Sequence, residues 1–248
     1  MEILGALVCG VFIGSVLGFV GAGGAMLTVP MLIYFFNFSA ATATTAALAI
    51  VISAATSGLI PKFKSKDVLV REAIIISGVG LVANVGFSLI VSRLSEEFIK
   101  SGFALVLIIA GISMLIKPVV GSERKVPLIW LLLISLVIGT MTGLFGVGGG
   151  FLAIPILVLF FRTSAVKAVG TSLLIIVLNS MIAFISHYAI WDQVNWEIPF
   201  VMAISAVIIA RLASIKASAL NTVALKRAFA YLLLAISAFT LLQTWIIS

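Results

Sequence analysis

Residues 18–50 read GFVGAGGAMLTVPMLIYFFNFSAATATTAALAI. Residues 143–175 read GLFGVGGGFLAIPILVLFFRTSAVKAVGTSLLI and align with the first stretch without a gap, at an offset of 125 residues. The alignment keeps glycine opposite glycine and proline opposite proline, and chance similarity between apolar stretches would not preserve that register. The chain is therefore predicted to be an internal duplication, with a first repeat at residues 1–122 and a second repeat at residues 123–248.

The composition predicts a helical membrane protein. Of the 248 residues, 63% are hydrophobic and 9% are charged, whereas a soluble domain has roughly 45–50% apolar and about 25% charged residues. A mean hydropathy of +1.36 leaves too few polar side chains to cover a globule in water, while a bilayer core needs about 20 apolar residues for each spanning helix. The apolar stretches also lack the alternation of an outer-membrane barrel. The predicted fold class is therefore all-α and polytopic.

Each repeat is predicted to contain a glycine-broken helical hairpin followed by three spanning helices. The hairpins are expected at residues 3–36 and 128–161, with glycine breaks at 21–24 and 146–150. The spans are expected at residues 40–60, 72–92, 98–116, 165–186, 198–215 and 228–247. Whether residues 25–36 and 151–161 cross fully or are re-entrant stays open, but either way each hairpin returns to its starting side. Three further spans place the ends of a repeat on opposite faces, so the second repeat is predicted to be inverted.

The loop charges orient this arrangement in the membrane. Residues 61–71 are rich in lysine, whereas the equivalent residues 186–197 contain Asp192 and Glu197 and no Lys or Arg. If residues 61–71 are cytoplasmic, every Lys and Arg except Arg93 and Lys100 falls on the cytoplasmic side, as the positive-inside rule requires. Both termini are therefore predicted to lie outside the cell.

The glycine breaks are the first candidate site. Closely spaced glycines interrupt a helix, and non-helical backbone at membrane depth is tolerated only where it is buried in protein or lines a wet site. The half-helix that follows each break offers unpaired N–H groups and the positive end of its dipole, which attract an anion. The alternative role is close helix packing, suggested by the GxxxG spacing upstream of each break. The predicted anion-binding glycines are Gly21, Gly23, Gly24, Gly146, Gly148, Gly149 and Gly150.

Neutral polar side chains beside the breaks are the second set of candidates. Hydroxyl groups can donate hydrogen bonds to an oxyanion, but in membrane helices they also bond to the carbonyl four residues earlier. Amides deep in an apolar span either contact the substrate or bridge neighbouring helices. The candidates are the hydroxyl residues Thr44, Thr45, Thr171 and Ser172 and the amides Asn84 and Asn179.

Several classes of protein are excluded by what the sequence lacks. A single cysteine, Cys9, excludes an internal disulfide, and a single histidine, His187, excludes a histidine-ligated metal cluster within one chain. The membrane interior supplies no nucleophile or base with suitable neighbours, so no enzyme, cofactor or metal is expected. The net charge of +7 is dispersed over short loops, so no nucleic acid is expected either. Membrane lipid is the expected surrounding, and the sequence leaves a homo-oligomer open.

Three segments resemble the signatures of a known family. GFVGAGGAMLTVP at 18–30, GLFGVGGGFLAIP at 143–155 and AVKAVGTSL at 165–173 are similar to those of the sulfite exporter TauE/SafE family, and the resemblance covers essentially the whole chain. It implies a transporter of sulfur-containing anions such as sulfite, thiosulfate or an organosulfonate, in the prokaryotic cytoplasmic membrane and often working as an exporter. The first repeat departs from the pattern, with ATATTAAL at 41–48 where the second has AVGTSL.

The spans also indicate how such an anion would be held. No Asp, Glu, Lys, Arg or His falls at the centre of a predicted span, so binding must use neutral donors. A cation would face the wrong ends of the half-helix dipoles. The sequence therefore predicts an alternating-access secondary transporter that holds the anion near the midplane, with an anion-selective channel or a membrane-embedded scaffold subunit as the alternative.

Overall fold

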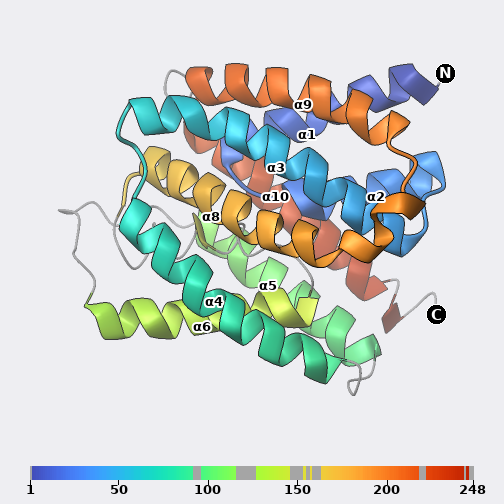
Figure 1. Ribbon diagram of the computed structural model, residues 1–248. Coiled ribbons are helices and arrows are strands. Elements are labelled where there is room, and N and C mark those ends of the chain that lie inside the picture. Colours follow the sequence, from blue (N-terminus) through green and yellow to red (C-terminus); the bar gives the residue numbers. More distant parts are fainter. Residues whose placement is uncertain are drawn as a thin grey trace. The chain divides into compact units, whose positions relative to one another are not determined.

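The computed structural model describes residues 2–91, 96–115, 127–145, 153–154, 157, 163–217, 222–242 and 244–245. Within these residues every regular element is a helix, which confirms the all-α prediction (Figure 1). The elements are α1 (Glu2–Val20), α2 (Gly24–Phe36), α3 (Ala40–Lys64), α4 (Val70–Val91), α5 (Glu96–Leu115), α6 (Leu128–Phe145), α8 (Ala165–Ser186), the 3₁₀ helix η1 (Tyr188–Gln193), α9 (Glu197–Lys216) and α10 (Thr222–Leu242).

Four of these helices, α1, α3, α8 and α9, are long and apolar enough to cross a membrane. A helix can span a bilayer alone because its backbone hydrogen bonds are satisfied within the segment. Large apolar side chains on α1 and α9 remain exposed, among them Leu4, Val8, Phe200 and Ile208. Such side chains suit lipid rather than water, so the protein is a polytopic membrane protein.

The chain forms two compact units, and each unit combines parts of both predicted repeats. Unit 1 comprises Met1–Ala73 and Val166–Leu220, and unit 2 comprises Ile74–Ala165 and Asn221–Ser248. Unit 1 therefore joins α1, α2 and α3 of the first repeat to α8, η1 and α9 of the second. The predicted ranges 1–122 and 123–248 are therefore repeats in the sequence, and they do not coincide with the two compact units.

In unit 1, α1 packs closely against α9 over most of its length (Figure 1). A Cβ atom at Gly14 would lie 2.9 Å from the Cα of Ala206, and Gly10 and Gly18 make similarly close contacts one turn before and after it. Only glycine allows two helix backbones to approach this closely. Gly10, Gly14 and Gly18 are the residues of the GxxxG spacing upstream of the first break, and these contacts show that they serve close helix packing.

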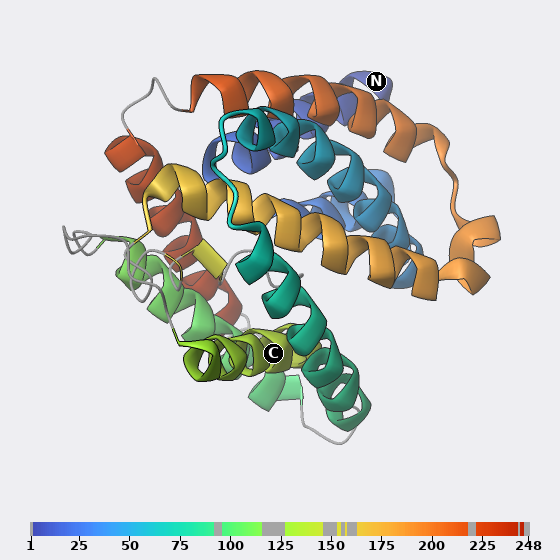
Figure 2. The ribbon, with the colours of Figure 1, turned by 60° about the vertical axis from the view of Figure 1, so that its left-hand side comes forward.

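In unit 1, α3 and α8 lie side by side and run antiparallel (Figure 2). The start of α3 meets the end of α8, where Thr45 bonds to His187, and the end of α3 meets the start of α8, where Lys62 contacts Gly170. The sequence offset relates Thr45 to Gly170 and Lys62 to His187. The two contacts are therefore equivalent to each other under the repeat.

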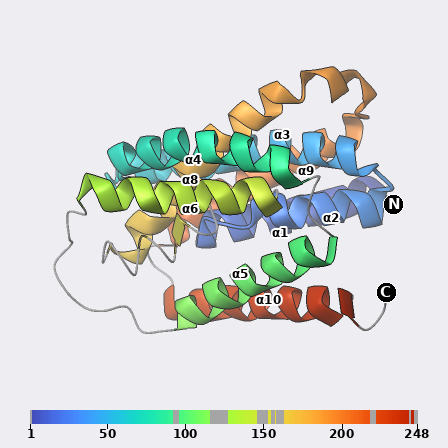
Figure 3. The same cartoon turned by 90° about the horizontal axis from the view of Figure 1, so that it is seen from below.

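In unit 2, α5 and α10 form a second antiparallel pair of repeat-related helices (Figure 3). The Trp245 indole N–H donates to the Ser101 hydroxyl at 3.1 Å, and Gly111 near the other end of α5 faces Ala230 and Leu234. The same unit brings Gly80 of α4 against Gly139 of α6. The offset relates this α4–α6 contact to the contact between α9 and α1 in unit 1, so the repeat preserves a packing arrangement as well as a sequence pattern.

Candidate functional site

The first glycine break joins α1 to α2 through a left-handed turn. Gly21 has a φ of 71° and Gly23 a φ of 81°, a conformation that residues with a side chain rarely adopt. Gly23 occupies the N-cap position of α2 and supplies no side-chain cap. The first hydrogen bond of α2 runs from the Leu27 N–H to the Gly23 carbonyl, so the N–H groups of the three residues before Leu27 precede the helical ladder.

This helix start is buried. Residues 21–24 are all buried, and the positive end of a helix dipole is equivalent to roughly half an elementary charge. Free N–H groups away from bulk water are costly unless a partner accepts their hydrogen bonds. The arrangement is suited to an anion and unsuited to a cation.

The break packs against the start of α8. A Cβ atom at Gly21 would lie 2.7 Å from Cγ1 of Val169, and the Ser172 hydroxyl donates to the Gly21 carbonyl at 2.7 Å. Ser172 of the second repeat therefore supports the break of the first repeat. Val169 is only four residues from the start of α8. Within unit 1 the break therefore lies beside the start of α8, which is close to the lysine-containing end of α3, and not beside the middle of α8.

The three candidate threonines use their hydroxyl protons within their own helices. Thr44 donates to the Ala40 carbonyl at 2.8 Å, Thr45 to that of Ala41 at 2.9 Å, and Thr171 to that of Lys167 at 2.7 Å. These are the i−4 bonds that hydroxyl residues commonly form in membrane helices. The Thr171 oxygen also accepts the Leu69 N–H at 3.0 Å, and Thr45 shares a 2.9 Å hydrogen bond with Nδ1 of His187. Their role toward a substrate remains a prediction.

The two candidate asparagines differ in their surroundings. Asn84 is half-buried in α4 of unit 2. Asn179 lies in α8 of unit 1, and its buried Oδ1 atom has no hydrogen-bond partner among the described residues. Ser172 and Asn179 are seven residues apart, so they lie on one face of α8, separated by about 10 Å. An unpaired buried carbonyl is destabilising, so this position is available to a ligand or a water molecule.

The remaining candidates, Gly146, Gly148, Gly149 and Gly150, lie outside the described residues. Within the described part of the chain, no group of three His, Cys, Asp or Glu side chains is placed to hold a metal ion. The site that can be built from the structure therefore consists of the first break and the part of α8 that supports it.

Sequence reasoning missed two polar residues in unit 1. Thr28 is fully buried in the first turns of α2 and donates to the Gly24 carbonyl at 2.6 Å. Lys62 is 3% exposed although it is close to the end of α3. The repeat carries a signal for Lys62, because the offset of 125 pairs it with His187, the only histidine.

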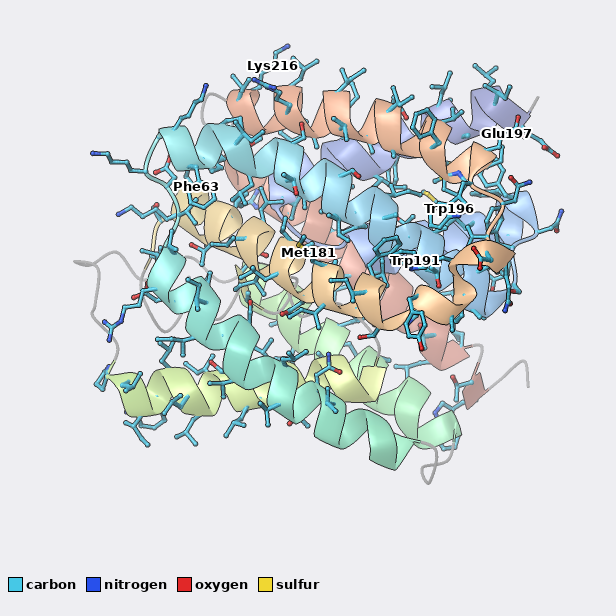
Figure 4. All side chains as sticks on the ribbon, viewed as in Figure 1. Phe63, Met181, Trp191, Trp196, Glu197 and Lys216 are labelled. Atoms are coloured by element: carbon cyan, nitrogen blue, oxygen red, sulfur yellow. The ribbon has the colours of Figure 1, made fainter. Side chains whose placement is uncertain are left out.

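The end of unit 1 at η1 is aromatic. The rings of Phe184 and Trp191 stack with centroids 4.6 Å apart, and Trp196 meets Phe184 edge-on at 6.2 Å. Figure 4 shows Trp191, Trp196 and Glu197 at this end of unit 1 and Lys216 and Phe63 at the other end. Tryptophan is typical of the membrane–water boundary, so this end of the unit is expected to lie at an interface.

Comparisons with known proteins agree with this architecture. The family model described as "Sulfite exporter TauE/SafE" matches residues 6–240. A "Probable membrane transporter protein" of Xylella fastidiosa (strain Temecula1 / ATCC 700964) is 26% identical over 245 residues, which cover 95% of this chain and 94% of that protein. "Probable membrane transporter protein YunE" of Bacillus subtilis (strain 168) is 27% identical over 224 residues, covering 77% and 79%. No solved structure matches the chain significantly.

The family match extends over nearly the whole chain and both repeats. It confirms the resemblance drawn from the three glycine- and proline-containing segments. It also confirms that the protein is a transporter and not an enzyme, because the family and these relatives are described as an exporter and as membrane transporters. The chain belongs to the sulfite exporter TauE/SafE family of multi-pass membrane transporters.

Proposed function

We propose that this protein is a secondary transporter that exports a small sulfur-containing anion by alternating access. The observation that carries the proposal is the buried start of α2, where Gly23 leaves the helix without a side-chain cap. Backbone N–H groups and a helix dipole bind an oxyanion without a fixed charge, so the anion can also be released. The family name adds the substrate class, a sulfite-type anion.

The proposed mechanism requires an inverted repeat. The antiparallel packing of the related helices α3 and α8, and of α5 and α10, supports such a repeat. The equivalent loops at residues 65–69 and 187–196 adjoin opposite ends of α3, a helix of 25 residues and therefore about 37 Å in length. With the lysine-rich loop in the cytoplasm, both termini lie outside, and the membrane is the prokaryotic cytoplasmic membrane.

The proposed anion contacts are the backbone of Gly21, Gly23 and Gly24 and, through the repeat, of the glycines at 146–150. Ser172 supports the first break, and Asn179 lies on the same face of α8, where its amide N–H group can donate to an anion while its unpaired Oδ1 atom can accept only from a donor such as water. Thr44, Thr45, Thr171 and Asn84 complete the proposed set. Their hydroxyl and amide groups are neutral, which agrees with the prediction that the anion is held by neutral donors because no ionisable residue falls at the centre of a predicted span.

Flux in proteoliposomes tests this proposal. Sulfite, thiosulfate, sulfate and sulfoacetate are compared with a carboxylate of similar size. We expect flux of at least one sulfur anion to saturate with concentration and to accelerate when the same anion is present on the opposite side, because a carrier returns faster when loaded. High conductance that does not saturate would instead identify a channel. Absence of flux for every sulfur anion would contradict the proposed substrate class.

A further inference from the structure

Two buried hydroxyl groups hydrogen-bond to the peptide groups of the first glycine break. Thr28 on α2 donates to the Gly24 carbonyl at 2.6 Å, and Ser172 on α8 donates to the Gly21 carbonyl at 2.7 Å. Both side chains are fully buried. The two acceptors flank Gly23 in the sequence, the residue at the N-cap position of α2, so the hydroxyl groups hold the turn on both sides of the helix start.

Alanine occupies both positions that the repeat relates to these hydroxyl residues. The offset of 125 residues pairs Thr28 with Ala153 and Ser172 with Ala47. Ala153 is 0% exposed and Ala47 is 1% exposed, so these positions are buried to the same degree as their counterparts. An alanine side chain cannot donate a hydrogen bond. At these positions the sequence therefore provides hydroxyl groups for the first break and none for the second.

The ordinary roles of buried hydroxyl groups do not explain this difference between the repeats. A threonine in a membrane helix commonly donates to the carbonyl four residues earlier, and a buried serine needs an acceptor. These rules explain where the two protons go, but not why a polar side chain occupies a buried position that alanine fills in the other copy. The net contribution of such a hydrogen bond to stability is small, because it replaces a hydrogen bond to water.

The two hydrogen bonds orient N–H groups at the start of α2. A peptide group is planar and trans, so its N–H points away from its carbonyl. The bond from Thr28 therefore fixes the direction of the Ala25 N–H, one of the three N–H groups before Leu27, and the bond from Ser172 fixes that of Ala22. A carbonyl that accepts a hydrogen bond also polarises its peptide group, which makes the N–H of that group a stronger donor.

We propose that Thr28 and Ser172 are positioning residues of the transport site, and that the first break, which they support, determines the affinity for the anion. The inference rests on the proposed function, in which backbone N–H groups of the break bind the anion. Each hydroxyl proton is donated to a carbonyl, so each residue acts through the peptide group that it orients. The two repeats then contribute unequally to binding, although their glycines are equivalent in the sequence.

Anion binding and flux in matched variants test this role. The probe is whichever of sulfite, thiosulfate, sulfate and sulfoacetate gives the highest flux in the unmodified protein. Thr28→Val removes one hydroxyl and keeps the side-chain shape, Thr28→Ser keeps the hydroxyl, and Ser172→Ala removes the other hydroxyl. Ala47→Ser and Ala153→Ser are the controls, because they add hydroxyl groups at the repeat-related positions. The dissociation constant is measured from the stabilisation of the detergent-solubilised protein by the anion, and the KM and maximal flux are measured in proteoliposomes.

We expect Thr28→Val and Ser172→Ala each to raise the dissociation constant and the KM by about threefold to tenfold, the factor that corresponds to one net hydrogen bond. The maximal flux per folded transporter should change little, because the hydroxyl groups orient the donors that bind the anion. Thr28→Ser should retain most of the affinity. Ala47→Ser and Ala153→Ser should leave the affinity unchanged.

Three results would overturn the proposal. Unchanged affinity in Thr28→Val or in Ser172→Ala would remove that residue from the site. An equal loss in Thr28→Val and Thr28→Ser would show that the shape of the side chain matters and not its hydroxyl. A comparable change in Ala47→Ser or Ala153→Ser would contradict the unequal contribution of the repeats. If the unmodified protein neither binds nor transports any of the four anions, the proposed function itself fails, so the two failures are distinguishable.

Hydrogen exchange in the unmodified protein covers the case in which a variant does not fold. Deuterium uptake of the backbone is read by mass spectrometry for peptides that span residues 21–28 and 146–153, with and without the same anion. Exchange of an N–H group requires the loss of its hydrogen bond, so a bound anion slows the exchange of the groups that it contacts. We expect stronger protection of residues 21–28 than of residues 146–153. Equal protection of the two segments, or none in the first, would overturn the proposal.

Discussion

At the scale of single residues, the break between α1 and α2 depends on glycine at two positions. Gly21 and Gly23 adopt positive φ values, and Gly21 also touches the backbone of Val169. A side chain at either position is strained whatever space surrounds it. The Ser172 hydrogen bond to the Gly21 carbonyl then fixes this turn against α8. The site is therefore built from backbone geometry more than from side-chain chemistry.

Gly23→Ala should destabilise the protein by about 1–2 kcal/mol, because alanine at that φ is close to its left-handed steric limit. Transport should fall by more than the loss of folded protein accounts for, since the N–H groups at the start of α2 would be displaced. Unfolding in mixed detergent micelles and sulfite flux measure the two effects. Gly78→Ala is the matched control, because a Cβ atom there meets nothing within 4 Å. Normal stability and flux in Gly23→Ala would contradict the proposed role of the break.

At the scale of helices, the contact between α1 and α9 is set by small residues on both sides. Gly10 faces Ser205 in unit 1, and the repeat-related residues Ser135 and Gly80 face each other in unit 2. The glycine has changed helices between the two copies. A glycine on either helix, opposite a serine on the other, is enough for the helices to approach, because the combined size of the two facing side chains limits the distance between the helices.

Gly14→Ala tests this close packing. A Cβ atom there would lie 2.9 Å from the Cα of Ala206 and 3.0 Å from the N of Ala210, both backbone atoms that cannot rotate away. We expect a loss of about 1–3 kcal/mol in the free energy of unfolding, the usual cost of overpacking. Gly5→Ala, on the same helix, meets only Phe36 ring atoms at 3.7 Å or more and should be neutral. Equal stability of the two variants would show that α1 and α9 can separate freely.

At the scale of the whole molecule, the proposed inverted repeat predicts which loops face the cytoplasm. Ser65 and Gln193 are exposed and belong to the equivalent loops that adjoin opposite ends of α3. An inverted duplication places these loops on opposite faces of the membrane, whereas a parallel duplication places them on the same face. The orientation therefore decides from which side of the membrane the proposed anion enters and on which side it is released.

Cysteine labelling measures this orientation. In a Cys9→Ala background, Ser65→Cys should react with a membrane-impermeant maleimide only from the cytoplasmic side, because its loop is lysine-rich. Gln193→Cys should react from outside in intact cells. Lysed cells, in which both sites are accessible, provide the control. Labelling of both cysteines from the same face would contradict the inverted repeat.

The driving force is also a property of the whole molecule. No ionisable residue falls at the centre of a predicted span, so we expect no proton to be carried by the protein. A monoanion leaving an inside-negative cell gains about 2.3 kcal/mol per 100 mV, enough for a gradient of more than tenfold. At a clamped potential, flux of a sulfonate that does not titrate should therefore be insensitive to a pH gradient. Strong acceleration by the gradient would implicate a protein group such as His187.

The sequence by itself determined the features that depend on local chemistry. The apolar composition indicated membrane helices, and the glycines at 21–24 located the end of α1 and the start of α2, because backbone freedom is a property of each residue. The offset of 125 revealed the repeat. Helix ends were less well predicted: α3 continues through Pro61 to Lys64, and α10 begins at Thr222 rather than at residue 228. Hydropathy measures only apolar content, so it does not detect the polar turns with which a helix begins or ends.

Only the tertiary structure decided which residues meet. Ser172 of the second repeat bonds to the break of the first repeat, and Lys62 is buried although its neighbours in the sequence suggested an exposed loop. Both facts follow from the packing of α3 and the α1–α2 break against α8, which combines distant segments into one unit. Burial and hydrogen bonding depend on neighbours in space, and in a duplicated chain the sequence does not say whether a helix packs within its own repeat or across to the other.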